Sequence, residues 1–134
     1  PLSTAIAATR KSGMEPVKLL LDAGADPNQK GQYSGPAYFT AGGAGIHPDV
    51  MQLLLDHGAD LKLRGSDGNS ALHTAILTEN WKVAQLLVEK GVDFTKDRGP
   101  GGLPLLVYLE NQVRTTNSDK QDLNALIQRM KSPR

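Results

Sequence analysis

The sequence contains no cysteine, few aromatic residues and almost no excess charge of either sign. Without cysteine, the 134-residue chain cannot form disulfide bonds, a thiolate metal site or a cysteine nucleophile. Aromatic residues make up 4% of the chain, which is few for a protein that stacks bases or sugars. The formal net charge is +1, so no strong electrostatic field favours nucleic acid or membrane surfaces. We therefore expect neither nucleic acid nor a membrane as a partner.

Long hydrophobic runs are also missing. A membrane-spanning helix needs about 18 apolar residues, and the longest candidate, Leu103 to Leu109, is much shorter and is interrupted by Pro104. The first residues, Pro1 to Thr4, do not form the basic and apolar regions of a secretion signal. We expect an intracellular, cytoplasmic protein. Because the chain does not begin with methionine, a trimmed, processed or longer natural form stays open.

One short motif occurs three times along the chain. Residues 19–26 read LLLDAGAD, residues 53–60 read LLLDHGAD, and residues 86–93 read LLVEKGVD. The glycines of these motifs, Gly24, Gly58 and Gly91, follow one another at nearly equal intervals. A regular period of about 33 residues predicts stacked units, each too small to bury its apolar face alone.

Each unit is predicted to contain two helices and a tight turn. In the third unit, residues 70–77 form a short helix and residues 81–89 form a second one, whose apolar residues recur at helical spacing on one face. Gly91 follows the second helix, where a residue in the left-handed conformation commonly ends a helix. Asp67–Gly68 is a turn dipeptide between units.

These features resemble the ankyrin repeat, whose signature is T-P-L-H-x-A followed by L-L-L-x-x-G-A-D. The best copy is SALHTA at residues 70–75, and weaker copies begin at Ser3, Ala37 and Leu103. The resemblance covers nearly the whole chain and implies an all-α solenoid of stacked helix–turn–helix units joined by β-hairpin-like loops. We predict a single domain of residues 1–134, with repeats at about 1–34, 35–67 and 68–100, a partial repeat at 101–117 and a C-terminal capping helix at 118–131.

Two parts of the chain depart from the ankyrin pattern. The second unit has a glycine-rich run at residues 42–45, which should weaken its first helix by about 1 kcal/mol per glycine relative to alanine. We expect these glycines to permit close packing or a bend. The fourth unit lacks the L-L-L-x-x-G-A-D half. A capping box at Ser118 and Gln121 instead predicts a final helix, which we interpret as a cap rather than a partner-docking helix. Its apolar stripe consists of Leu123, Leu126, Ile127 and Met130.

The sequence contains no recognisable catalytic or metal-binding pattern. His47, His57 and His73 lack the spacing of metal ligands, and structural roles are expected for all three. The glycine-rich run is not followed by the Gly-Lys-Ser/Thr of a phosphate-binding loop, and no serine lies in a Gly-x-Ser-x-Gly motif. We predict a protein that is not an enzyme and that uses no cofactor and no metal.

The resemblance implies that a partner protein binds the concave face, which hairpin tips and first helices form. The tips map to Lys30–Ser34, Leu63–Asp67 and Asp97–Pro100. The solvent-facing positions of the first helices map to Arg10, Lys11, Ala41, Ala44, Thr74, Thr78, Val107 and Glu110.

Partner contacts are predicted from residue type within this surface. Because tyrosine, tryptophan and arginine are frequent interface anchors, we expect Tyr33, Arg64 and Arg98 to contact the partner, with Asp67 and Asp97 as polar partners. Arg10 and Thr74 complete the predicted site. Tyr38 and Tyr108, by contrast, occupy first-helix positions that are expected to face the core.

The leading hypothesis is a non-enzymatic, monomeric module that binds another protein, such as an adaptor, an inhibitor or an immunity-type protein. One alternative is a structural ankyrin segment of a larger protein. Another is a small-ligand-binding or enzymatic domain in which the glycine-rich run marks the site.

Overall fold

The computed structural model describes residues 2–29, 35–43, 45–65, 68–94, 96–115 and 120–131. Over these ranges the chain is helical, with one isolated antiparallel bridge between Arg98 and Pro104. No helix in the same ranges combines the length and the hydrophobicity required to cross a membrane. In chain order the elements are α1 (Leu2–Ala7), α2 (Thr9–Ser12), α3 (Glu15–Asp22), the 3-10 helix η1 (Ala37–Gly42), α4 (Pro48–Asp56), α5 (Ala71–Leu77), α6 (Trp81–Glu89), the 3-10 turn η2 (Pro100–Gly102), α7 (Leu105–Thr115) and α8 (Lys120–Lys131).

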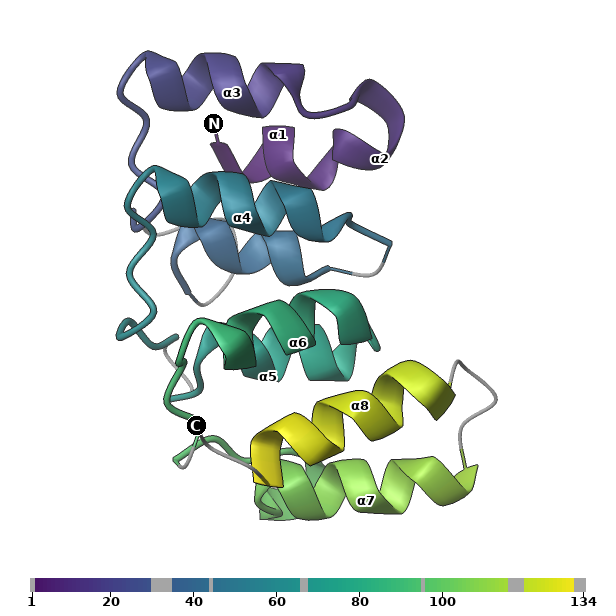
Figure 1. Ribbon diagram of the computed structural model, residues 1–134. Coiled ribbons are helices and arrows are strands. Elements are labelled where there is room, and N and C mark those ends of the chain that lie inside the picture. Colours follow the sequence, from purple (N-terminus) through teal and green to yellow (C-terminus); the bar gives the residue numbers. More distant parts are fainter. Residues whose placement is uncertain are drawn as a thin grey trace.

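The helices stack in two layers along one axis (Figure 1). The inner layer contains α1, η1, α5 and α7, and the outer layer contains α3, α4, α6 and α8. Within a unit the inner helix packs on the outer helix, as α5 does on α6, and adjacent units pack through pairs such as η1 and α5. The predicted all-α stack of helix–turn–helix units is confirmed.

A glycine in the left-handed conformation follows each of the first three outer helices. The φ angles of Gly24, Gly58 and Gly91 are 98°, 96° and 88°. A side chain with a Cβ atom would be strained at such a φ. In each unit the next residue donates its amide hydrogen to the carbonyl five residues earlier, at 2.9 to 3.1 Å, which ends the helix. The repeated glycine therefore has the role that the sequence predicts for Gly91.

The glycine-rich second unit has a 3-10 helix where the third unit has an α-helix. Its glycines allow a close approach, because a Cβ atom on residue 42 would lie 3.2 Å from the backbone nitrogen of Ala75 in α5. The loop that follows is held by the next unit. Thr78 Oγ1 donates to the carbonyl of Gly42 at 2.5 Å, and Asn80 Nδ2 donates to the carbonyl of Gly43 at 2.8 Å. The expectation that these glycines permit close packing is confirmed.

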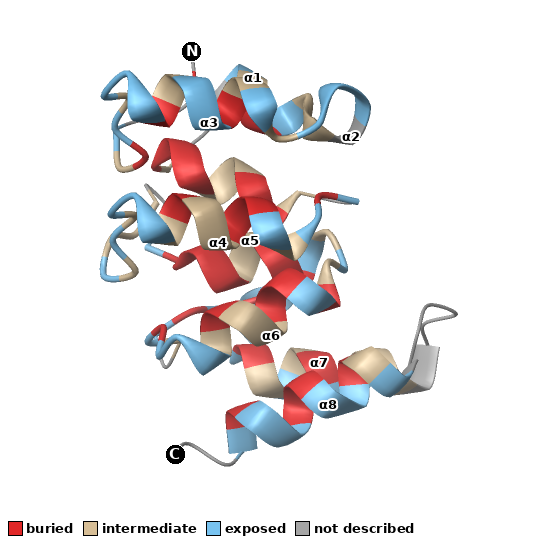
Figure 2. Ribbon diagram, turned by 45° about the horizontal axis from the view of Figure 1, so that its top comes forward, coloured by how far each residue is buried: buried red, intermediate tan, exposed pale blue. Residues whose placement is uncertain are grey.

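The core is continuous between the units, and buried residues lie where the helices face one another (Figure 2). Tyr38 in η1 is fully buried, as predicted, and its hydroxyl donates to the carbonyl of Asp60 at 2.7 Å. Burial, with a smaller contribution from the negative charge of Asp60, raises the pKa of Tyr38. Trp81, at the start of α6, is also buried, whereas Tyr108 is only half-buried.

Helix α8 completes the outer layer at the C-terminal end of the stack (Figure 1). It packs on α6 and α7, and the four residues of its predicted apolar stripe are all buried. Gln85 Nε2 donates to the carbonyl of Asp122 at 3.2 Å, and Arg129 pairs with Glu89. The predicted helix at 118–131 is observed from Lys120 onward, while Ser118 of the predicted capping box lies outside the described residues.

Replacing Leu126 with alanine should lower the free energy of unfolding by about 2–5 kcal/mol, because its fully buried side chain leaves a cavity. The matched control is Leu19→Ala on α3, where the leucine is 61% exposed and the expected change is within about 0.5 kcal/mol. Urea denaturation of both variants measures the difference. An equal decrease in the free energy of unfolding of the two variants would show that Leu126 of α8 is not part of the core.

The raised pKa of Tyr38 predicts alkaline destabilisation. In the unfolded chain this phenol ionises near its ordinary pKa of about 10, whereas the buried phenol of the folded chain does not. Its contribution to stability is therefore complete below that pH and is lost as the pH rises further. An ultraviolet titration of tyrosinate should contain a late component that coincides with unfolding and is absent from Tyr38→Phe. If all tyrosines instead titrate reversibly near the ordinary pKa of about 10, the burial of Tyr38 is contradicted.

Candidate functional site

The loops between units have the hairpin geometry that the sequence predicts. Gly65 N donates to the carbonyl of Asn69 at 2.9 Å, and Gly99 N donates to the carbonyl of Leu103 at 2.7 Å. These two pairs occupy equivalent places in adjacent units, one repeat apart. The hairpins therefore repeat with the helices and form one edge of the stack.

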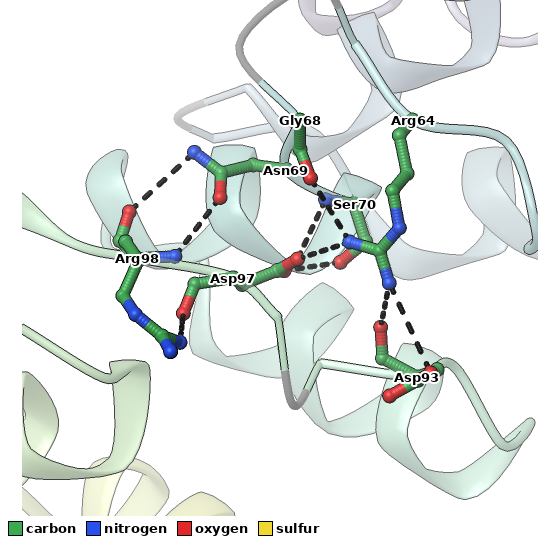
Figure 3. Close-up of polar contacts among 7 residues, drawn as sticks. All are labelled: Arg64, Gly68, Asn69, Ser70, Asp93, Asp97 and Arg98. Atoms are coloured by element: carbon green, nitrogen blue, oxygen red, sulfur yellow. Dashed lines mark hydrogen bonds and ion pairs between the residues drawn. The ribbon is translucent and has the colours of Figure 1, made fainter.

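Asp97 is not at the surface of this edge, contrary to the prediction that it is a polar contact for a partner. Its side chain is fully buried (0% exposed). Asp97 Oδ1 accepts a hydrogen bond from Ser70 N at 2.9 Å, and Oδ2 accepts one from the Ser70 hydroxyl (Figure 3). The carboxylate thereby supplies acceptors for the first turn of α5, where backbone amides have no helical partner. The assignment of Asp97 to an exposed contact is wrong because its carboxylate is directed at Ser70 and at Arg64 of the preceding hairpin.

Arg64 reaches from its own hairpin to this buried carboxylate. Its Nη1 atom lies 2.7 Å from Asp97 Oδ1 and donates to the carbonyl of Gly68 at 3.1 Å. Its Nη2 atom donates to the carbonyl of Asp93 at 2.9 Å. We expected Arg64 to be an open anchor for a partner, but the structure directs its guanidinium into the protein and leaves the side chain 26% exposed. Arg64 therefore joins two neighbouring hairpins.

Two asparagines also join neighbouring hairpins. Asn28 Oδ1 accepts from Asp60 N at 2.7 Å, and Asn28 Nδ2 donates to the carbonyl of Gly58 at 2.9 Å. Further along the edge, Asn69 Oδ1 accepts from Arg98 N at 2.9 Å. The sequence reasoning did not identify these residues. Their residue type could have indicated this role, because an asparagine side chain carries both a hydrogen-bond donor and an acceptor and can bond to loop backbone.

The other predicted contacts are distributed along the hairpin edge and the inner layer. Arg98 is exposed, and its Nη1 atom donates to the carbonyl of Asp97 at 2.8 Å. Thr74 is half-buried on α5. Arg10 belongs to α2, but its side chain is not described, and Tyr33 and Asp67 lie outside the described residues.

The helix positions that were predicted to face solvent are only partly correct. Lys11, Val107 and Glu110 are exposed as expected, whereas Ala41 is fully buried. The expectation for Ala41 is wrong because η1 lies within the stack, packed against α1, α4 and α5. Leu77 was missed, and it is 46% exposed at the end of α5. Its position three residues after Thr74, on the same side of the helix, could have revealed it.

In the glycine-rich run, the amides of Gly43 and Ile46 are not available to a phosphate group. A phosphate cradle presents free backbone N–H groups to an anion, but Gly43 N donates to the carbonyl of Thr40 at 3.0 Å and Ile46 N donates to the carbonyl of Gly43 at 3.2 Å. The carbonyl of Ile46 accepts a hydrogen bond from Asn80 at 2.9 Å. Over the described part of the chain, no group of three potential metal-ligating side chains is present.

Two histidines have the structural roles that their positions suggest. His47 precedes α4, and its Nδ1 atom accepts a hydrogen bond from Asp49 N at 3.0 Å, which caps the helix. His57 follows α4, with Nδ1 3.0 Å from the carbonyl of Leu53 and Nε2 3.4 Å from Asp22 Oδ1. The first of these His57 contacts lies within the end of α4, and the second links it to the end of α3 in the preceding unit.

A family model described as ankyrin repeats, with three copies, matches residues 4–98. The chain belongs to the ankyrin-repeat family. The matched region includes the first three units and ends at Arg98, so α7 and α8 lie beyond it. Ankyrin repeats are protein–protein interaction modules, and domains of this family are typically non-enzymatic.

Comparison with individual proteins agrees with this assignment. The human B-cell lymphoma 3 protein is 36% identical over 116 residues, which is 83% of this chain and 25% of that protein. Human transient receptor potential cation channel subfamily A member 1 is 34% identical over 100 residues, which is 73% of this chain and 9% of that protein. The crystal structure of the ankyrin repeat domain of Bcl-3, described as a unique member of the IkappaB protein family, superposes with a TM-score of 0.67 at 32% identity. That match covers 94% of this chain and 54% of the Bcl-3 chain.

The buried carboxylate of this ankyrin domain can be tested directly. Asp97→Ala should lower the free energy of unfolding by about 3–5 kcal/mol, because it leaves the buried amide and hydroxyl of Ser70 and the charge of Arg64 without their acceptor. The matched control is Asp93→Ala, whose 63% exposed carboxylate lies 4.0 Å from the same guanidinium and should contribute less than about 1 kcal/mol. Guanidinium denaturation measures the free energy of unfolding of both variants. An equal decrease in the two would contradict the assignment of a larger role to the buried carboxylate.

Proposed function

We propose that this ankyrin domain binds a partner protein on its inner layer and on the adjoining hairpin edge. The observation that supports this proposal best is the preorganised edge. Asn28, Arg64 and Asn69 join consecutive hairpins through hydrogen bonds to the backbone. A surface that is already ordered loses little conformational entropy when a partner binds.

Within this surface, the residues that contact the partner are proposed from their type and their position. Arg98 lies on the edge with its backbone held by Asn69, and Thr74 lies on the inner helix α5. Arg10, Tyr33 and Asp67 remain candidates from the sequence. Arg64 and Asp97 shape the surface rather than contact the partner. The proposed module acts as a monomer and without catalysis, cofactor or metal, in an intracellular location.

A second candidate function is that of a structural ankyrin segment in a larger protein. The relative lengths favour it, because this chain spans 25% of the B-cell lymphoma 3 protein and 9% of the channel protein. The ligand-binding alternative receives less support, since the amides of Gly43 and Ile46 already donate within the glycine-rich loop.

A matched pair of charge reversals tests the proposed binding face. Arg98→Glu changes the hairpin edge, and Lys82→Glu makes the same change at an exposed position of the outer helix α6. Proteins captured by each tagged variant, from cells that express the natural protein, are quantified by mass spectrometry. We expect Arg98→Glu to reduce the capture of the main partner by about tenfold, which corresponds to a loss of about 1.4 kcal/mol, and Lys82→Glu to leave it unchanged.

Thermal unfolding of both variants provides the control, since each should retain the melting temperature of the original chain. Unchanged capture by Arg98→Glu, or an equal loss with Lys82→Glu, would contradict binding at the hairpin edge.

A further inference from the structure

The outer helix of the first unit is less buried than its counterparts in the second and third units. The repeated motif aligns Leu20 of α3 with Leu54 of α4 and Leu87 of α6. Leu54 and Leu87 are fully buried, whereas Leu20 is only half-buried. Four residues earlier in each helix, the valines of α4 and α6 are also buried, whereas Pro16 of α3 is half-buried. The difference follows the position in the stack, since α4 and α6 lie between other units and α3 lies at one end (Figure 1).

The uncovered apolar residues of α3 form one continuous stripe. Four residues share the spacing i, i+3, i+4 and i+7, which places them on one side of the helix: Pro16, Leu19, Leu20 and Ala23. Leu19 is 61% exposed, and Ala23, the C-cap residue, is exposed as well. At about 100° per residue, this α3 stripe borders the buried side of the helix, which contains Val17 and Leu21. The charged residues lie on the remaining side: Glu15, Lys18 and Asp22.

The opposite end of the stack is closed by polar residues. Helix α8 packs on α6 and α7 and buries all four residues of its apolar stripe. Apart from Ala125, the exposed residues described in α8 are polar or charged: Gln121, Asn124, Gln128, Arg129 and Lys131. The terminal elements of a repeat stack need such a polar outer side. Helix α8 meets this requirement, whereas α3 leaves a stripe with two leucines uncovered (Figure 2).

The chain itself shows what covers the equivalent positions. In the second and third units, the residues that correspond to Pro16 and Leu20 are buried within a stack of ankyrin units. Helix α6, for example, packs on α4 of the unit before it. The Bcl-3 structure agrees with a longer stack, because the match covers 94% of this chain but only 54% of that ankyrin repeat domain. A neighbouring ankyrin unit is therefore an occupant of suitable shape and chemistry for the α3 stripe.

The first inner helix is also compatible with a unit in front of it. Residues 2–6 read LSTAI, and residues 72–76, which follow the hairpin of the second unit, read LHTAI. Leu2 and Ile6 are buried, as Leu72 and Ile76 are. The first unit therefore has the inner-helix pattern of a unit that follows another unit.

We propose that the α3 stripe is the docking surface for a further ankyrin unit of the same polypeptide, placed ahead of α1. That unit covers Leu19 and Leu20 with apolar side chains, and the charged side of α3 stays in water. This inference uses a different surface from the partner-binding proposal and does not depend on it. It gives the second candidate function, a structural segment of a larger protein, a specific point of attachment.

A chain extended by one unit tests the fit. A copy of residues 37–70 is joined to Pro1, so that Leu2 follows the added hairpin as Leu72 follows the original one. We expect the extension to raise the melting temperature by about 5 °C or more, because it buries the α3 stripe. An extension of the same length made of glycine and serine is the control, and it should leave the melting temperature unchanged.

Substitutions locate the new contact. Leu20→Ser should lower the melting temperature by about 5 °C more in the extended chain than in the 134-residue chain, because only the extended chain buries this leucine fully. Lys18→Ser, the matched change on the charged side of α3, should have the same effect in both chains. Equal effects of Leu20→Ser in the two chains, or no stabilisation by the added unit, would overturn the inference.

The source of the unit is tested on the natural protein. Mass spectrometry of the protein from its own cells should identify a further ankyrin motif before Pro1, and a natural protein with too few preceding residues for a unit would overturn the inference. Sedimentation of the 134-residue chain should show a monomer. A dimer that Leu19→Ser dissociates would overturn the inference in favour of a second copy. Capture of a separate protein that Leu19→Ser abolishes and Arg98→Glu does not would overturn both this inference and binding at the hairpin edge.

Discussion

The structure depends on apolar surface that neighbouring units share. No unit can bury its own apolar face, because each consists of two short helices, and helices as short as α1 and α6 have little stability without tertiary packing. Stacking solves this problem by placing η1 between α1 and α5, and α8 against α6 and α7. The burial of Leu126 and the close approach of Gly42 to Ala75 are two local consequences of the same requirement.

The hairpin edge satisfies a second requirement that stacking creates. When units come together, backbone amides and carbonyls near the hairpins leave water, and each needs a new partner. Asp97 supplies acceptors to Ser70, Arg64 bridges to the carbonyl of Asp93, and Asn28 and Asn69 replace missing backbone partners. Among the described residues no buried side-chain nitrogen or oxygen lacks a hydrogen bond. These bonds hold the described residues of consecutive hairpins together.

The helices were more predictable than the site, for a physical reason. The bounds of α6, the left-handed Gly91 and the buried stripe of α8 follow from periodicity and from backbone strain, which are local properties. Arg64 and Asp97 were chosen as partner contacts from residue type and loop position. Such reasoning cannot distinguish a charged residue that faces solvent from one that pairs with a residue of the next hairpin, a full repeat away in the sequence.

The sequence by itself determined the repeat, the two helices of each unit and the glycine that follows each of the first three outer helices, because these depend on side-chain spacing and on allowed backbone angles. Only the tertiary structure decided which polar residues of the hairpins are buried and which apolar residues of the inner layer stay exposed. Asp97 is buried and bonded to Ser70 and to Arg64 of the preceding hairpin, while Leu77 is left exposed at the end of its helix. Burial is a property of neighbours that lie far apart in the chain, so local pattern alone could not assign it.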